Sequence, residues 1–237
     1  HLPVMMQVGA MAAHGVLGEI TYAYGEYLHD VRDLLRDEQG NPTWRARYPA
    51  AIQYSTHELG PILEILNDSI VSVSTSAPGQ HSGRLADGMS GTNVAVFRTR
   101  RDAIIVQRND FASPRPSIGR RYVIQGSLGM VEVSYGRPCT GRYFLEKERQ
   151  AGWQDLAQAP PPFAPPDESG LPPWALSGGH GTVEYHMVRG FLDAVRQGAR
   201  QGRCDVRRGL EMSLPGIVAA ASLKQDGALL PVPQVPR

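Results

Sequence analysis

The chain has 237 residues, of which 41% are hydrophobic and 20% are charged, a composition typical of a globular protein. Lysine and arginine number 24 and aspartate and glutamate 23, a balance that gives no indication of a nucleic-acid or membrane-surface partner. No apolar run approaches the roughly 20 residues that span a bilayer. Two cysteines, Cys139 and Cys204, are too few for a disulfide framework and indicate thiols of a reducing compartment, so we expect a cytoplasmic protein. The sequence is also compatible with a single disulfide between these two cysteines.

The first third of the chain predicts a helix, a strand and a second helix. Val4–His14 predicts a short helix, and Gly18–Asp30 predicts a strand because it is rich in β-branched and aromatic residues. Ala50–Asn67 carries a broad apolar stripe and predicts the next helix. Pro61 lies inside that pattern, so this helix either begins near Leu59 or kinks at the proline.

The middle of the chain predicts a run of short strands joined by tight turns, which is typical of an antiparallel meander. The predicted strands are Ile70–Thr75, Thr92–Thr99, Asp102–Gln107, Arg121–Gly126 and Gly129–Ser134. A Pro-rich loop follows over residues 157–173, and two helices, Val183–Gln197 and Arg207–Lys224, close the chain.

This order of elements predicts an α+β fold, with one open, mostly antiparallel sheet of about six strands and helices packed on one face. We expect residues 1–237 to form one domain. A sheet face left bare is typical of an interface, so we also expect a homo-oligomer that associates through it.

A dinucleotide-binding domain would show a strand, a Gly-x-Gly-x-x-Gly turn and a helix whose N-terminus holds the pyrophosphate. The sequence has no such unit, because its Gly-rich stretch, Ser177–Gly181, follows the Pro-rich loop instead of a predicted strand. We therefore expect no Rossmann domain in this chain and no NAD bound by the chain alone.

Two pairs of polar aromatic residues suggest chemistry. Tyr27 and His29 are two residues apart on the predicted strand and share a face. Tyr54 and His57 are three residues apart, which on a helix also places them on one face. Histidine exchanges protons near neutral pH, so these pairs could move protons or bind a polyol. A polar strand end and a semi-buried structural histidine explain the same residues, and both interpretations stay open.

Two further stretches could belong to a ligand site, but ordinary loops explain them equally well. Glycines around His180 would let the backbone approach a ligand, and Thr182 is a candidate helix N-cap beside Tyr185. Trp44 and Arg45 join an aromatic plane to a fork of hydrogen-bond donors, which sugar sites use.

A metal site is a weaker alternative. The conceivable ligands are His29, His57, His180 and Glu26, but no pair of them has diagnostic spacing. A divalent metal stays possible, while the preferred interpretation has none.

Together these stretches resemble the C-terminal α/β domain of the glucose–fructose oxidoreductase / inositol dehydrogenase / MocA (Gfo/Idh/MocA) family. The resemblance lies in Leu17–Ile20, Glu26–Asp30, Tyr54–Ile62 and Gly178–Tyr185, and its specific parts are Tyr-x-Thr-His-x-Leu-Gly-Pro and Gly-Gly-His-Gly. Within the family, the chain is most similar to the branch of NAD-dependent glycosidases that includes α-N-acetylgalactosaminidases. Dehydrogenases of the family often have aspartate four residues before the histidine that matches His57, whereas this chain has Gln53, which favours the glycosidase branch.

The resemblance implies a sugar site. Its catalytic candidates are His57, Tyr54, His29 and Tyr27, and its substrate-binding candidates are Arg45, Tyr185, His180 and Glu26. It also implies that NAD oxidises a sugar hydroxyl at C3 so that the glycoside can be eliminated, and that NAD and the catalytic lysine belong to an N-terminal Rossmann domain that this chain lacks. A missing domain or a partner chain would then supply them. Two alternatives stay open. One is a stand-alone lyase or hydrolase of 3-keto sugars, which a metal could assist. The other is a non-catalytic carbohydrate-binding or assembly subunit.

Overall fold

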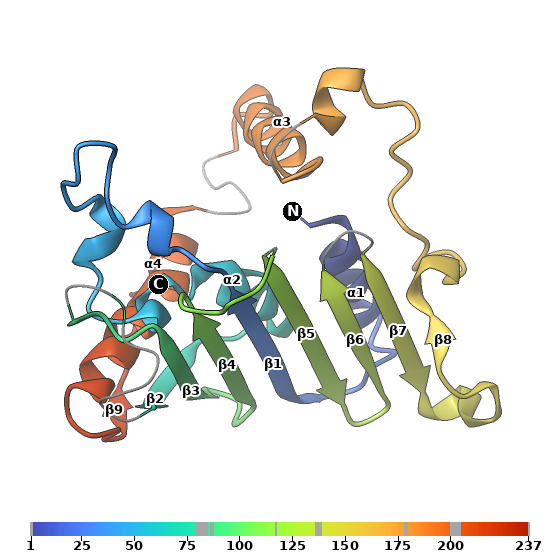
Figure 1. Ribbon diagram of the computed structural model, residues 1–237. Helices are drawn as coiled ribbons and strands as arrows, with labels where there is room; N and C mark the ends of the chain where they lie inside the picture. The colour runs from blue at the N-terminus through green and yellow to red at the C-terminus, as the bar shows by residue number, and fades with distance from the viewer. Residues whose placement is uncertain are drawn as a thin grey trace.

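The computed structural model describes residues 2–78, 85, 88–116, 118–135, 139–177, 180–199 and 205–236. Within them, nine strands form one sheet in the order β8-β7-β6-β5-β1-β4-β3-β2-β9 (Figure 1). The strands are β1 (Ile20–Leu28), β2 (Ile70–Ser76), β3 (Thr92–Thr99), β4 (Ile104–Asp110), β5 (Gly119–Gly126), β6 (Gly129–Tyr135), β7 (Thr140–Leu145), β8 (Gln154–Asp155) and β9 (Leu230–Pro231). β1 and β4 are parallel, and the other neighbours are antiparallel.

The predicted fold class is confirmed: the sheet is open and mostly antiparallel, and all six predicted strands are present. The prediction of about six strands was too low. β7 was missed because Gly141 and Arg142 interrupt its short apolar pattern, and β8 and β9 have only two residues each, too few to show any periodicity.

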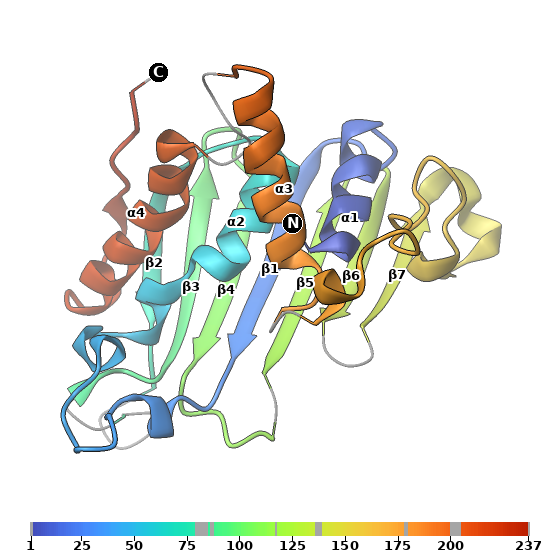
Figure 2. The ribbon, with the colours of Figure 1, turned by 90° about the horizontal axis from the view of Figure 1, so that it is seen from above.

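Three helices cover one face of the sheet: α1 (Pro3–Ala13), α2 (Thr56–Leu66) and α4 (Val206–Leu223) (Figure 2). Between helices and sheet lies the core, whose wholly buried side chains include Val8, Met11, Leu59, Ile62, Leu63, Phe97 and Ile105. Removing each such side chain from water stabilises the fold by about 1.5–3 kcal/mol. A fourth helix, α3 (Val183–Arg196), lies on the same side but contributes no buried residue.

The predicted helix over Ala50–Asn67 is two elements, a 3-10 helix called η3 (Ala51–Tyr54) and then α2, which begins at Thr56 instead of near Leu59. Pro61 lies inside α2. Because proline has no N–H, the carbonyl of His57, four residues earlier, lacks its usual helical partner. The hydroxyl of Tyr122 on β5 donates to this carbonyl at 3.3 Å, so the sheet supplies the missing hydrogen bond.

Buried amide side chains of the sheet hold the junction between η3 and α2. Asn93 Oδ1 accepts from the backbone N–H of Ile52 at 3.0 Å. Asn109 Nδ2 donates to the carbonyls of Ala51 and Tyr54 at 3.3 and 3.2 Å, and Gln107 Nε2 donates to Asn109 Oδ1 at 2.7 Å. Buried amides that hydrogen-bond to the backbone in this way favour one local geometry, so Tyr54 and His57 are held over the ends of β3 and β4.

No described element covers the opposite face of the sheet. Exposed apolar side chains of β3 and β4 lie there, namely Val94, Val96 and Ile104. Charged side chains accompany them, and Glu132 pairs with Arg142 at 2.8 Å. We call this surface the open sheet face. Within the described part of the chain, every helix is too short or too polar to cross a bilayer.

Candidate functional site

The four catalytic candidates lie together at the carboxyl end of β1. Tyr27 belongs to β1 and His29 follows it, whereas Tyr54 ends η3 and His57 lies in the first turn of α2. The hydroxyl of Tyr27 is 3.0 Å from His29 Nδ1. The ring centroids of Tyr54 and His57 are 4.4 Å apart, and those of Tyr27 and His57 are 5.1 Å apart. Segments distant in sequence thus form one cluster, which we call the aromatic cluster.

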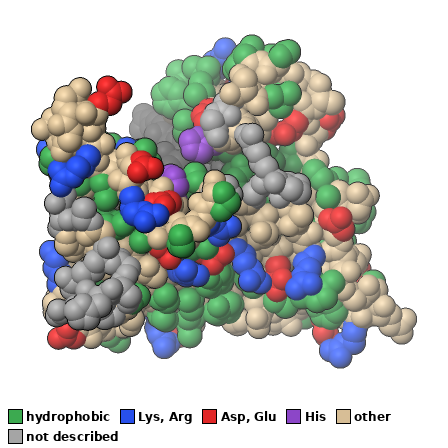
Figure 3. All heavy atoms as spheres, viewed as in Figure 1, with side chains coloured by type: hydrophobic (Ala, Val, Ile, Leu, Met, Phe, Trp, Pro, Cys, Tyr) green, Lys and Arg blue, Asp and Glu red, His purple; other side chains and the backbone are tan. Residues whose placement is uncertain are grey.

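Parallel pairing explains why the cluster forms at this edge. The carboxyl ends of β1 and β4 meet because these strands run in the same direction, so Phe111, directly after β4, reaches the ring of Tyr54 at 5.7 Å. The loop after β1 adds Trp44 and Tyr48, whose rings lie 6.4 and 6.0 Å from Tyr54. Figure 3 views the molecule from this end and shows histidine side chains between α3 and the strand ends.

Two arginines supply positive charge. The guanidinium of Arg45 lies 4.4 Å from the ring centroid of Trp44. Arg120, the second residue of β5, is nearly buried and lies 5.2 Å from the ring centroid of Tyr27. Arg120 is not among the predicted site residues, because the predicted strand, Arg121–Gly126, begins one residue later. Strand alternation was the signal that could have found it, because Arg120 lies on the same strand face as the buried Tyr122 and Ile124.

Burial and these cations keep the cluster neutral. Burial chiefly, with the charge of Arg120, lowers the pKa of His57 to about 4, and burial with the charge of Arg45 lowers the pKa of His29. Burial also raises the pKa of Tyr27 and of Tyr54. At neutral pH, two neutral imidazoles and two neutral phenols therefore face two guanidinium groups. A neutral imidazole can take up a proton, and a guanidinium can stabilise a developing negative charge.

A wholly buried carboxyl lies next to His57 in the sequence. Glu58 Oε2 accepts from Gln107 Nε2 at 3.4 Å, and burial raises the pKa of Glu58 well above its usual value. The buried side-chain atoms that lack a hydrogen-bond partner among the described residues gather at this place. They are Ser55 Oγ, His57 Nδ1, Glu58 Oε1, Gln107 Oε1 and Arg120 Nε, five of seven such atoms in the described part of the chain. Because buried polar groups are normally paired, this concentration makes the place a candidate functional site.

Glu26 lies away from the aromatic cluster. It alternates with Tyr27 on β1, so its side chain is on the open sheet face, where Tyr24 donates to Glu26 Oε2 at 2.7 Å. The structure therefore does not bring this substrate-binding candidate together with the others.

The ring and ion-pair contacts of the candidates before and within α3 are with residues outside the aromatic cluster. His180 is exposed, with Nδ1 2.6 Å from a Glu184 oxygen, and it is near enough for its charge to lower the pKa of His57. Tyr185 contacts Trp174, with ring centroids 5.7 Å apart. Thr182 occupies the N-cap position as predicted, but its hydroxyl donates to Glu168 at 2.5 Å instead of capping the helix. The glycines before His180 lie outside the described residues.

The conceivable metal ligands do not converge. Glu26 faces away from His29 and His57, and the described residues contain no group of three His, Cys, Asp or Glu side chains able to hold a metal ion. Cys139 is an exposed free thiol, and Cys204 lies outside the described residues.

The described residues also do not fit a dinucleotide. β1 is followed by a 3-10 turn (Arg32–Leu34) and a polar loop, and the sequence has no Gly-x-Gly-x-x-Gly turn that would bring a backbone up to a pyrophosphate.

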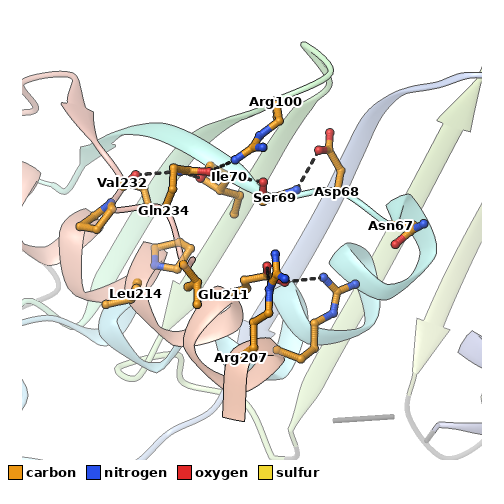
Figure 4. Close-up of a pocket in the computed structure, with 14 residues that line it drawn as sticks. Asn67, Asp68, Ser69, Ile70, Arg100, Arg207, Glu211, Leu214, Val232 and Gln234 are labelled. Atoms are coloured by element: carbon orange, nitrogen blue, oxygen red, sulfur yellow. Dashed lines mark hydrogen bonds and ion pairs between the residues drawn. The ribbon is translucent and has the colours of Figure 1, made fainter. Parts of the chain in front are cut away.

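A separate polar pocket of ≈ 390 Å³ lies between the end of α2 and the start of α4 (Figure 4). Its arginines already engage protein acceptors: Arg207 pairs with Glu211 at 3.2 Å, Arg208 with Glu211 at 2.9 Å, and Arg100 donates to Gln234 at 2.7 Å. None of the predicted candidates lines this pocket, so the aromatic cluster remains the candidate site.

Comparison with known proteins identifies the family of the chain. Residues 3–237 match the family model described as glycosyl hydrolase 109, C-terminal domain. Over 218 residues the chain is 28% identical to glycosyl hydrolase family 109 protein 1 of Akkermansia muciniphila, covering 79% of this chain and 44% of that protein. A family 109 protein of Saccharopolyspora erythraea is 26% identical over 261 residues, covering 98% of this chain and 54% of that protein. The chain spans about half the length of these relatives.

Solved structures share the fold at low identity. An oxidoreductase domain protein from Kribbella flavida has a TM-score of 0.78 at 18% identity, over 98% of this chain and 63% of its own. Levoglucosan dehydrogenase in complex with NADH and levoglucosan has a TM-score of 0.76 at 17% identity, over 98% and 64%. An inositol dehydrogenase homolog from Azotobacter vinelandii has a TM-score of 0.73 at 18% identity, over 97% and 62%. The chain therefore belongs to the glycosyl hydrolase 109 C-terminal domain family, an enzyme family, and has the fold of Gfo/Idh/MocA C-terminal domains.

Proposed function

We propose that this chain is the substrate-binding half of a glycoside-processing enzyme and that the aromatic cluster is its sugar site. The observation that carries the proposal is the convergence of Tyr27, His29, Tyr54 and His57 beside Arg120 at the ends of the parallel strands.

The residues of the cluster suit a sugar. Aromatic rings pack against the apolar faces of a pyranose, and a few well-placed polar groups orient its hydroxyls. Trp44 is half exposed and Tyr54 partly buried, so both rings offer a face, while Arg45 and Arg120 offer donors.

The proposed chemistry is elimination from a 3-keto sugar, in which the carbonyl makes the neighbouring C2 proton acidic. Neutral His57 takes that proton, the electron pair forms a C1–C2 double bond, and the C1–oxygen bond to the aglycone breaks as the leaving oxygen gains a proton. Arg120 and Arg45 stabilise the charge that develops on the C3 oxygen. Water then adds at C1 and a proton returns to C2. The lowered pKa of His57 keeps its imidazole able to act as this base.

Oxidation at C3 belongs to another part of the enzyme. The relatives are about twice as long as this chain, and levoglucosan dehydrogenase, a solved structure with this fold, is a complex with NADH. We propose that the rest of a full-length enzyme, in the same or a partner chain, carries the nicotinamide.

The test is release of aglycone from a 4-nitrophenyl glycoside and from its 3-keto form, each with and without NAD. The chain should cleave the 3-keto form without NAD and leave the ordinary glycoside intact. Cleavage of the ordinary glycoside without NAD, or inactivity on every 3-keto substrate, would contradict the proposal. Binding without cleavage would favour the carbohydrate-binding subunit.

We also propose that copies of the chain associate through the open sheet face. Val94, Val96 and Ile104 are exposed there beside charged residues of neighbouring strands, and exposed apolar groups of this kind are typical of interfaces.

A further inference from the structure

Helix α3 carries an apolar stripe that the described residues leave uncovered. Met187, Phe191 and Val195 recur every four residues, and Val188 and Leu192 lie beside them. These five side chains are between 42% and 67% exposed, and no residue of α3 is buried. A helix with so distinct an apolar face normally packs it against a partner. We call these five residues the α3 stripe.

The other side of α3 is polar and internally paired. Arg189 Nε donates to Asp193 at 2.9 Å, and Arg196 Nη1 donates to the same carboxylate at 3.4 Å. At the start of the helix, Glu168 Oε1 accepts a hydrogen bond from the Thr182 hydroxyl at 2.5 Å and lies 3.2 Å from His186 Nε2. These contacts attach the helix to its own chain through polar groups at its start and leave the α3 stripe available.

The apolar surface continues beyond the helix. A groove of ≈ 520 Å³ runs between α3 and the 3-10 helix η7 (Pro173–Leu176), with Val188, Leu192 and Trp174 in its walls. Trp174 is 68% exposed. An exposed tryptophan beside exposed aliphatic side chains is typical of a protein interface.

The position of α3 indicates what covers it. The helix lies over the helical side of the sheet, and His180, just before it, acts on the pKa of His57 (Figures 1 and 2). The start of α3 thus lies on the same side of the sheet as the aromatic cluster. A match to 44% of one relative and 54% of another leaves about half of each protein to be placed.

We infer that the α3 stripe and the neighbouring groove form the docking surface for the remaining, nicotinamide-bearing part of a full-length family 109 enzyme. This inference rests on the proposed function and names the surface through which the two halves join. The open sheet face, which we assign to association between copies, is distinct in sequence and in place.

The test uses a chimera in which this chain follows the part of the Akkermansia muciniphila protein that lies outside the matched region. Hydrogen exchange of residues 183–196 is compared between the chimera and the 237-residue chain. We expect exchange to slow by at least about tenfold in the chimera. Phe191→Ser with Val195→Ser should restore fast exchange, whereas the matched control, Val94→Ser with Val96→Ser, should not.

Three results would overturn the inference. One is equal exchange of α3 in the two proteins. Another is a lower melting temperature of the 237-residue chain on introducing the two serines into α3, because the stripe would then pack within its own chain. The last is self-association of that chain which these serines abolish, because a second copy would then be the occupant. The measurement uses no sugar, so protection of α3 in a chimera inactive on 3-keto substrates would refute the proposed function alone.

Discussion

Replacing Glu58 by glutamine tests the electrostatics beneath the site. The carboxyl is wholly buried and burial raises its pKa well above the usual 4.5, so the folded protein keeps a proton that the unfolded chain releases. Between the two pKa values the folded state binds more protons, and stability therefore falls as pH rises. The slope is about 1.4 kcal/mol per pH unit for one such group. Glutamine has nearly the same shape and no such dependence.

The assay is urea unfolding of wild type and Glu58→Gln at pH 5 and pH 6. We expect the free energy of unfolding of the variant, relative to wild type, to rise by about 1.4 kcal/mol over this interval. Other titrating groups, His57 included, are common to both proteins and cancel in the difference. Parallel pH profiles would refute the reasoning, because they would show that Glu58 is ionised in the folded protein.

Three further predictions concern other parts of the molecule. His57→Ala should abolish turnover of 3-keto glycosides while circular dichroism shows an intact fold. Because the pKa of His57 in the folded protein, about 4, lies below the usual 6.5, the free energy of unfolding of wild type should rise between pH 4 and pH 6.5 more steeply than that of the variant. Equal dependence on pH in the two proteins would contradict this. Gly25→Ala should cost about 1–3 kcal/mol in thermal unfolding, because a Cβ there would lie 2.9 Å from Glu58 Cβ, whereas Gly209→Ala, a helical position with open space, should stabilise by about 0.5–1 kcal/mol. Val96→Lys with Ile104→Lys should convert an associating protein to a monomer in light scattering, and a monomeric wild type would argue against the interface.

Local pattern was enough for most of the fold. Alternation and turn residues place the hairpin of β5 and β6, and the apolar stripe of α2 places its buried face. The parallel pairing of β1 with β4 was not predictable in this way. About 75 residues separate the two strands, and the local sequence of a strand does not specify which strand pairs with it. That pairing creates the edge on which the aromatic cluster forms.

The candidate site residues also differ in whether local sequence was enough to predict them. Tyr27, His29, Tyr54 and His57 were found because each pair is close in sequence and the resemblance joined the pairs. Arg120 was not predicted because its place in the cluster depends on a contact with Tyr27 between β5 and β1, which are distant in sequence. Glu26 was a sequence neighbour of Tyr27, but alternation along the strand sends its side chain to the opposite face.

The hydroxyl of Tyr122 and the ring of Pro61 impose a joint constraint on how this sequence can change. Proline leaves the His57 carbonyl without a helical donor, and Tyr122 supplies one from the sheet. Phenylalanine at position 122 would leave that carbonyl unsatisfied, whereas alanine at position 61 would make the hydroxyl dispensable. Substitutions at these two positions should therefore be tolerated together more readily than tyrosine loss alone. A helix-breaking residue thus ties the backbone of His57 to the same strand that carries Arg120.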